Sequence, residues 1–167
     1  LHETGSTVCM CPTTERDLGD GVGPTREFAD AGIPITLGSD SHAVIDHFEE
    51  SRAIELDERL MSEERGVHTA DDLLRMATIT GQQSIGWHDA GTLAVGNRAD
   101  LVTVVLDSVR TAGADPSNPV ATSVFAASAS DVRSVVVDGR LIVEDHRHMD
   151  IDVATELAAS ITELMED

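Results

Sequence analysis

The sequence predicts an α/β fold in its first half, with parallel β-strands joined by helices, and a β-rich second half. Two short apolar runs, at residues 7–11 and 33–37, have the length of buried strands and stop at proline or glycine. Apolar residues at helical spacing lie between and after these runs, which is the order typical of parallel strands with helical crossovers. After Trp87 the sequence changes to short apolar runs separated by glycine, which favours further strands.

The first strand is predicted at Thr7–Cys11 and stops at Pro12. Residues 11–23 contain three glycines, one proline and several carboxylates, so we expect a long loop there and no regular element. A short helix should run from Pro24 to Gly32, followed by the second strand. That strand carries a run of small and polar residues at its carboxyl end: Gly38, Ser39, Asp40, Ser41 and His42.

Residues 46–65 are predicted to form an amphipathic surface helix that ends at Gly66. Its apolar positions are Phe48, Ala53, Leu56, Leu60 and Met61. We interpret its carboxylates as a solvated face: Glu49, Glu50, Asp57, Glu58, Glu63 and Glu64. Thr69 followed by Asp72 has the spacing of a capping box, and this pair should begin a further helix that ends before Gly81.

The second half is expected to contain strands at residues 91–106, 120–127 and 133–143. Asp138 and Gly139 can form a two-residue hairpin turn within the last of these segments. A closing helix at residues 151–165 is predicted from a stripe of four apolar side chains: Val153, Leu157, Ile161 and Leu164.

The chain is strongly acidic, with 11 Lys plus Arg against 31 Asp plus Glu and a formal net charge of −20. This balance argues against nucleic-acid binding and against a polybasic membrane anchor. The 41% hydrophobic content is enough for a packed interior. Because the chain begins at Leu1 in mid-element, we expect it to be part of a longer protein, and with two close cysteines we expect a reducing, cytoplasmic setting.

Asp40 is the main candidate for chemistry, because parallel α/β folds place ligand-binding groups at the carboxyl ends of their strands. A local helix cap is the competing interpretation. His42 and His47 are close in sequence, but the chain lacks the compact ligand spacing of a self-contained zinc site. Cys9 and Cys11 should share one face of their strand, and small buried side chains explain them without a function.

Four segments resemble the amidohydrolase superfamily: CPTTERDLGDG at residues 11–21, ITLGSDSH at 35–42, GTLAVGNRADLV at 91–102 and VVVDGRLIVEDHRH at 135–148. Within it, the first two segments look most like the formimidoylglutamate deiminases of histidine degradation. The resemblance implies the carboxyl-terminal part of a (β/α)8 TIM-type barrel plus part of a small β-sandwich domain. Residues 1–86 would then belong to the barrel, 87–149 to the β-rich sandwich portion and 150–167 to a carboxyl-terminal helix.

By this resemblance, Asp40 matches the aspartate that contacts the single catalytic Zn²⁺ and handles protons. The other metal ligands would be histidines from earlier barrel strands, so this chain alone should neither bind zinc tightly nor turn over. The implied reaction converts N-formimidoyl-L-glutamate, a small-molecule substrate, to N-formylglutamate and ammonia, and the residues that bind the substrate stay unassigned.

Two alternatives to this function stay open. One is another amidohydrolase deaminase, acting on guanine, a thioadenosine-type nucleoside or a chlorotriazine. The other is a non-catalytic truncated module that packs against a partner chain. A homodimer of the full-length parent is compatible with each enzymatic alternative.

Overall fold

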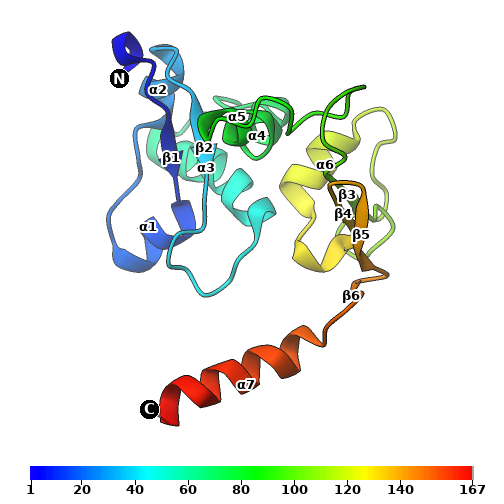
Figure 1. Ribbon diagram of the computed structural model, residues 1–167. Coiled ribbons are helices and arrows are strands. Elements are labelled where there is room, and N and C mark those ends of the chain that lie inside the picture. Colours follow the sequence, from blue (N-terminus) through cyan, green and yellow to red (C-terminus); the bar gives the residue numbers. More distant parts are fainter. Residues whose placement is uncertain (167) are drawn as a thin grey trace.

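The computed structural model describes residues 1–166. The first half contains a 3₁₀ helix η1 (His2–Thr4), then β1 (Val8–Met10), α1 (Pro12–Leu18), α2 (Thr25–Asp30), β2 (Ile35–Leu37), α3 (His47–Ser62), α4 (Ala70–Met76) and α5 (Ile79–Ser84). The second half contains β3 (Leu101–Val104), α6 (Pro119–Ala126), a 3₁₀ helix η2 (Ala129–Asp131), β4 (Val132–Val137), β5 (Arg140–Glu144), β6 (Arg147–His148) and α7 (Val153–Glu166). Figure 1 shows this arrangement.

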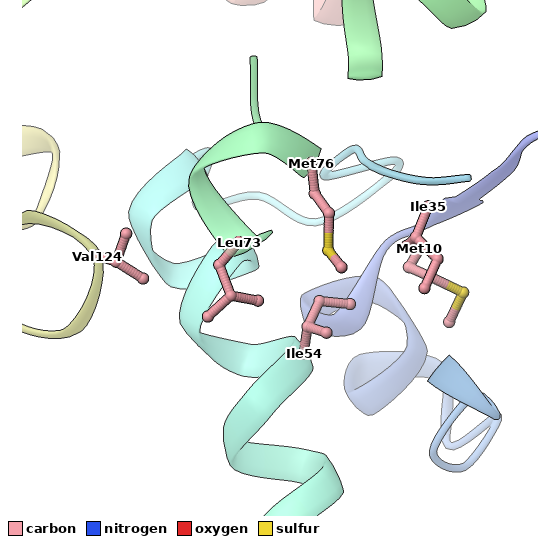
Figure 2. Close-up of a cluster of buried hydrophobic side chains, with 6 residues drawn as sticks. All are labelled: Met10, Ile35, Ile54, Leu73, Met76 and Val124. Atoms are coloured by element: carbon pink, nitrogen blue, oxygen red, sulfur yellow. The ribbon is translucent and has the colours of Figure 1, made fainter. Parts of the chain in front are cut away.

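The two predicted strands pair in parallel, which confirms the α/β prediction for the first half. Val8 pairs with Ile35 and Met10 with Leu37, so these four apolar side chains share one face of the two-stranded sheet. That face packs on helices, and Met10 and Ile35 belong to a buried cluster with Ile54, Leu73, Met76 and Val124 (Figure 2). The core therefore fixes the strands by one face and leaves the other to small and polar side chains.

The expected loop at residues 11–23 is wrong, because α1 occupies Pro12–Leu18. Pro12 lies in the first turn, where its missing N–H costs nothing, and Gly19 ends the helix with a φ of 74°. The side chain of Glu15 reaches back and accepts a hydrogen bond from the N–H of Cys11, at 2.8 Å. Gly19 and Glu15, which we interpreted as loop residues, therefore cap the two ends of a short helix.

The helix predicted at residues 46–65 is confirmed as α3, with Asp46 as its N-cap, but its solvated face is wrong in part. Glu50 is 0% exposed and Glu58 is 1% exposed. Conversely, Leu60 and Met61 of the predicted apolar stripe are 82% and 51% exposed. Two donors from Thr13 stabilise the buried Glu50 carboxylate, and Arg26 pairs with Glu58 Oε1, at 2.9 Å. Such partners lower the free-energy cost of burying a carboxylate.

The second half holds a four-stranded antiparallel sheet in the order β3-β4-β5-β6. The hairpin turn between β4 and β5 is confirmed, with φ values of 49° at Asp138 and 78° at Gly139. The strand predicted at residues 120–127 is wrong, since this segment is α6, which contacts α3 and α4. Asn118 caps α6, and Pro119 starts it, so a short apolar run alone did not distinguish strand from helix. A sandwich built on this sheet, and the predicted domain boundaries, stay predictions.

The closing helix is confirmed as α7, and Asp167, the last residue of the predicted 150–167 segment, lies outside the described residues. The helix extends away from the other elements (Figure 1), and it has no buried residue. Its apolar stripe is exposed to solvent. Within residues 1–166, no helix has the length and apolar character needed to span a membrane.

Candidate functional site

The site lies at the carboxyl edge of β1 and β2. Because these neighbouring strands are parallel, the residues that follow each of them meet at one edge: Cys11 after β1 and the Gly38–His42 segment after β2. Asp40 is exposed there, and none of the hydrogen bonds and ion pairs within residues 1–166 engages its carboxylate. Its φ of 49° lies in the left-handed region, which non-glycine residues seldom adopt. The structure therefore presents Asp40 to solvent on a constrained turn, and it does not use the carboxylate as a helix cap.

One hydroxyl group holds both ends of this turn. Thr14 Oγ1 donates a hydrogen bond to the carbonyl oxygen of Ser39, at 2.6 Å, and accepts one from the N–H of His42, at 2.9 Å. The N–H of His42 also lies 3.2 Å from the same Ser39 carbonyl oxygen. The two ends of the segment that carries Asp40 are thus hydrogen-bonded to each other and to α1.

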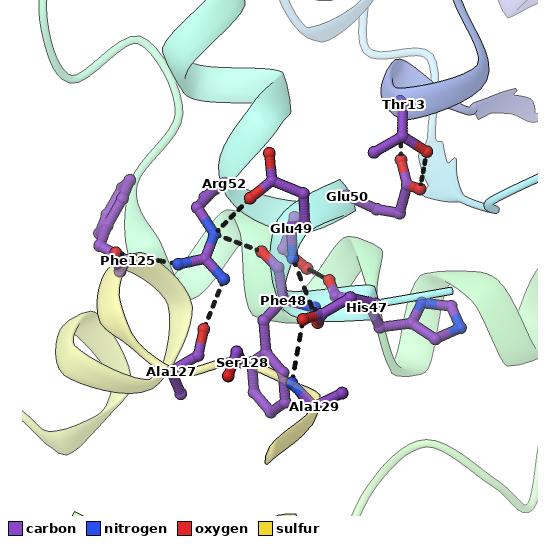
Figure 3. A network of polar contacts seen from close by, with 12 residues as sticks. Thr13, His47, Phe48, Glu49, Glu50, Arg52, Phe125, Ala127, Ser128 and Ala129 are labelled. Atoms are coloured by element: carbon purple, nitrogen blue, oxygen red, sulfur yellow. Dashed lines mark hydrogen bonds and ion pairs between the residues drawn. The ribbon is translucent and has the colours of Figure 1, made fainter. Parts of the chain in front are cut away.

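The amino-terminal end of α1 is held in turn by a buried carboxylate on α3. Glu50 Oε2 accepts a hydrogen bond from the N–H of Thr13, at 3.1 Å, and Glu50 Oε1 accepts one from the Thr13 hydroxyl. Figure 3 shows the carboxylate aimed at Thr13, on the side of α3 away from Arg52. No ion pair within residues 1–166 involves Glu50, so these donors and the start of α1 stabilise its position.

The first turns of α3 are also joined to the segment that follows α6 (Figure 3). Asp46 accepts hydrogen bonds from the N–H of Phe48, at 2.9 Å, and from the N–H of Ala129, at 2.9 Å. Arg52 donates to the carbonyl oxygens of Phe125, at 3.2 Å, and Ala127. These contacts make α3 the shared support of the Asp40 turn and of α6.

The two cysteines share one face, as predicted, but their interpretation as buried side chains is wrong, because Cys9 is exposed and Cys11 is half-buried. Both thiols lie against Gly38: a Cβ atom there would meet Cys11 Sγ at 3.2 Å and Cys9 Sγ at 3.3 Å. Burial, the neighbouring thiol of Cys9 and the carboxylate of Asp40 raise the pKa of Cys11 to about 12. Cys11 is therefore protonated at neutral pH and is a poor nucleophile.

The histidines near Asp40 do not join it in a cluster. His42 Nδ1 contacts the backbone of Val44, and the ring of His47 points away from the contacts around Arg52 (Figure 3). Further along the chain, His148 Nδ1 accepts hydrogen bonds from the N–H groups of Asp150 and Ile151. No group of three or more His, Cys, Asp or Glu side chains that could hold a metal ion occurs within residues 1–166.

A cleft of about 680 Å³ lies elsewhere, between α3, α6 and residues 110–114. Two of the arginines that line it are held by buried carboxylates: Arg59 by Glu55, at 2.7 Å, and Arg110 by Asp131, at 2.8 Å. Asp40 does not line this cleft, so the cleft is separate from the candidate site.

Comparison with known proteins gives the family of this chain. The model described as "Amidohydrolase family" matches residues 1–142. The chain belongs to the amidohydrolase family. One relative is a formimidoylglutamate deiminase of Pseudomonas aeruginosa, which is 35% identical to this chain over 155 residues. The aligned region covers 89% of this chain and 34% of that protein. The chain is 33% identical over 156 residues to a 5-methylthioadenosine/S-adenosylhomocysteine deaminase of Natronomonas pharaonis, with 91% and 35% covered.

Solved structures place this amidohydrolase fold among zinc-containing enzymes. An adenosine deaminase from Xanthomonas campestris with bound zinc superposes with a TM-score of 0.88 at 26% identity, over 96% of this chain and 37% of that chain. The atrazine chlorohydrolase of Arthrobacter aurescens in complex with zinc gives a TM-score of 0.83 at 26% identity, over 96% and 36%. The amidohydrolase chain thus spans about a third of the length of these relatives.

Proposed function

We propose that this chain is the carboxyl-terminal part of a zinc-dependent amidohydrolase that converts N-formimidoyl-L-glutamate to N-formylglutamate and ammonia. The observation that carries the proposal is the exposed carboxylate of Asp40, which follows β2 at its carboxyl end and has no partner among residues 1–166. A strand end is where barrel enzymes hold their catalytic groups. The identity of 35% to a formimidoylglutamate deiminase supports the choice of substrate, as does the Cys11–Gly21 segment that forms α1.

Asp40 fits a metal site as one ligand, because its carboxylate oxygens are accessible and have no other partner within residues 1–166. Catalytic zinc needs three protein ligands, so the remaining donors must come from outside the described residues. When bound, zinc lowers the pKa of water from about 15.7 to about 7 and so supplies a nucleophile at neutral pH.

The part that this chain plays in the reaction is proton transfer. The Asp40 carboxylate accepts the proton from the attacking water and then delivers it to the departing nitrogen of the formimidoyl group. Protonation lets that nitrogen leave as ammonia, which is a far better leaving group than an amide anion. Thr14 and the turn that it holds keep the carboxylate oriented during both transfers.

A thioadenosine-type nucleoside is the second candidate substrate. It is favoured by the 33% identity to the enzyme of Natronomonas pharaonis and by the 31% identity, over 98% of this chain, to one of Haloarcula marismortui. The chlorotriazine alternative has less support from sequence identity, since the chlorohydrolase structure is 26% identical. The guanine alternative stays a prediction. We further propose a reducing, cytoplasmic setting, a small-molecule substrate and a homodimer of the full-length parent.

The experiment that tests the proposal uses the full-length protein and its Asp40→Asn variant. Ammonia release is measured with N-formimidoyl-L-glutamate and, in parallel, with 5′-methylthioadenosine and guanine, and bound zinc is measured by elemental analysis. We expect turnover of the formimidoyl compound by the unaltered protein. Asp40→Asn should lower it by a factor of at least about 10³, because the amide cannot accept the proton.

The matched control is Asp138→Asn, which changes the same functional group on the remote hairpin turn, where Asn is also favoured. It should leave ammonia release unchanged. Turnover of methylthioadenosine alone would move the function to the second candidate, and full activity of Asp40→Asn would contradict both. The chain of residues 1–167 expressed alone, with one ligand, should show neither turnover nor tight zinc binding.

A further inference from the structure

We propose that Thr14 is a positioning residue for Asp40: its hydroxyl group fixes the turn that aims the carboxylate at the metal and substrate. This inference rests on the proposed function, because it concerns the same site. Thr14 lies in α1, between 25 and 28 residues away in sequence from the backbone groups that it holds.

The geometry requires a group that both donates and accepts. Thr14 Oγ1 donates to the carbonyl oxygen of Ser39, at 2.6 Å, on one side of Asp40, and accepts from the N–H of His42, at 2.9 Å, on the other side. A hydroxyl is the smallest side-chain group that can do both. One atom therefore sets the separation of the two ends of the segment that contains Asp40.

Asp40 needs this support because no hydrogen bond or ion pair holds its side chain in the described part of the chain, residues 1–166. Its side chain is exposed, and its φ of 49° is a conformation that most non-glycine residues avoid unless their surroundings impose it. The hydrogen bond between His42 N–H and the Ser39 carbonyl oxygen is long, at 3.2 Å, and is the other backbone contact across this turn. The Thr14 hydroxyl is thus the principal restraint on the direction of the carboxylate.

Thr14 can serve as a fixed point because it is itself immobilised. Its side chain is 3% exposed, and the preceding residue, Thr13, gives both its N–H and its hydroxyl to the fully buried carboxylate of Glu50. The restraint therefore runs from α3 through Glu50 and Thr13 to Thr14, and from there to the Asp40 turn. Side chains that hold a catalytic group in this way often determine metal affinity and rate as strongly as some ligands do.

The test compares Thr14→Val and Thr14→Ser in the full-length protein. Valine keeps the shape and removes both hydrogen bonds, whereas serine keeps the hydroxyl. We expect Thr14→Val to lower kcat and zinc affinity by about 10–100-fold each, with KM changed less than threefold, and the acidic limb of the kcat pH profile to shift. Thr14→Ser should stay within about threefold of the unaltered protein in every measurement. Thr14→Ala serves as a second variant without the hydroxyl, and the same losses are expected.

Thr103→Val is the matched control, since it makes the same change at an exposed position on β3 and should alter nothing. Folded Thr14→Val with normal kcat and normal zinc affinity would overturn the inference, and so would equal losses in the serine and valine variants. Zinc affinity, measured by competition with a chromogenic chelator, needs no substrate. It therefore tests Thr14 even where the unaltered protein fails to act on N-formimidoyl-L-glutamate, which would refute only the proposed substrate.

Discussion

Replacement of Glu50 tests the buried contact on which α1 depends. Glu50→Leu leaves the N–H and the hydroxyl of Thr13 without their acceptor, in a position where Glu50 is 0% exposed and Thr13 is 6% exposed. A buried donor without a partner costs about 1–3 kcal/mol. Two such donors, partly offset by the apolar transfer of leucine, give an expected loss of about 2–4 kcal/mol in the free energy of unfolding.

Glu50→Gln should behave differently, because the Thr13 hydroxyl can reverse its role. The amide oxygen accepts from the Thr13 N–H, the amide NH₂ donates to the hydroxyl oxygen, and every group keeps a partner. The expected loss is below about 1 kcal/mol. Urea denaturation followed by far-UV circular dichroism measures the free energy of unfolding of the leucine and the glutamine variants. Thermal unfolding should give a melting temperature about 4–16 °C lower for the leucine variant, at roughly 2–4 °C per kcal/mol.

Glu163→Leu on the exposed face of α7 is the control, and it should change stability by less than about 0.5 kcal/mol. The reasoning is refuted if Glu50→Leu is as stable as the unaltered protein, because the acceptor would then contribute nothing. A glutamine variant that is destabilised as much as the leucine variant would show instead that the negative charge, and not the pair of acceptors, holds α1.

Two further predictions concern other ionisable groups. The Arg110 guanidinium holds the pKa of Asp131 well below its ordinary range. The ionised Asp131 carboxylate therefore stabilises the folded state above about pH 4, and this stabilisation is lost as the pH falls below that value. Arg110→Met should therefore lower the melting temperature at pH 7, and the difference in melting temperature between this variant and the unaltered protein should become smaller below pH 4. A difference that stays constant with pH would contradict this prediction. Burial, then Cys9 and Asp40, raise the pKa of Cys11 to about 12, so iodoacetamide at pH 8 should modify exposed Cys9 well before Cys11, as judged by tandem mass spectrometry. Equal rates would contradict the assignment.

Features with local signals could be predicted from the sequence. The Asp138-Gly139 turn needs two positive φ values, and these residue types tolerate them. The capping box from Thr69 to Asp72 is present with both of its hydrogen bonds, because it depends on two residues within one turn. Strands β1 and β2 were found because their apolar runs are short and stop at Pro12 and Gly38, a length and a boundary that favour a strand.

The helices α1 and α6 were missed for opposite reasons. The segment that forms α1 is rich in residues that break regular structure, but Pro12 and Gly19 stand at the start and end positions where they favour a helix. The segment that forms α6 is a short apolar run, and Asn118 with Pro119 at its start was the available signal for a helix. In both segments, proline, glycine or asparagine indicates a helix because it stands at a helix end, and its presence in the segment alone does not.

The candidate site shows the same limit. The position of Asp40 after a parallel strand could be predicted, because the apolar run and its end are visible in the sequence, and its role as a metal ligand stays a prediction. Thr14 and Glu50 could not be predicted, because their partners lie 25 and 37 residues away and depend on how α1 and α3 pack. We predicted that Glu50 is solvated because its neighbours in sequence are charged. A run of charged residues does not indicate which of its side chains is buried.

The buried carboxylates of α3 explain why this helix lacks a simple amphipathic pattern. Glu50 binds Thr13 of α1, Glu58 pairs with Arg26 of α2 at 2.9 Å, and Glu55 accepts from the N–H groups of Gly66, at 2.6 Å, and His68. Burial alone would raise the pKa of Glu55, but these donors and Arg59 outweigh it and lower the pKa. Where an amphipathic helix would bury apolar side chains, α3 buries acceptors that fix the segments on either side of it. One of these acceptors, Glu50, binds the residue next to Thr14, so on the proposed role of Thr14 the irregular polarity of α3 serves the Asp40 turn.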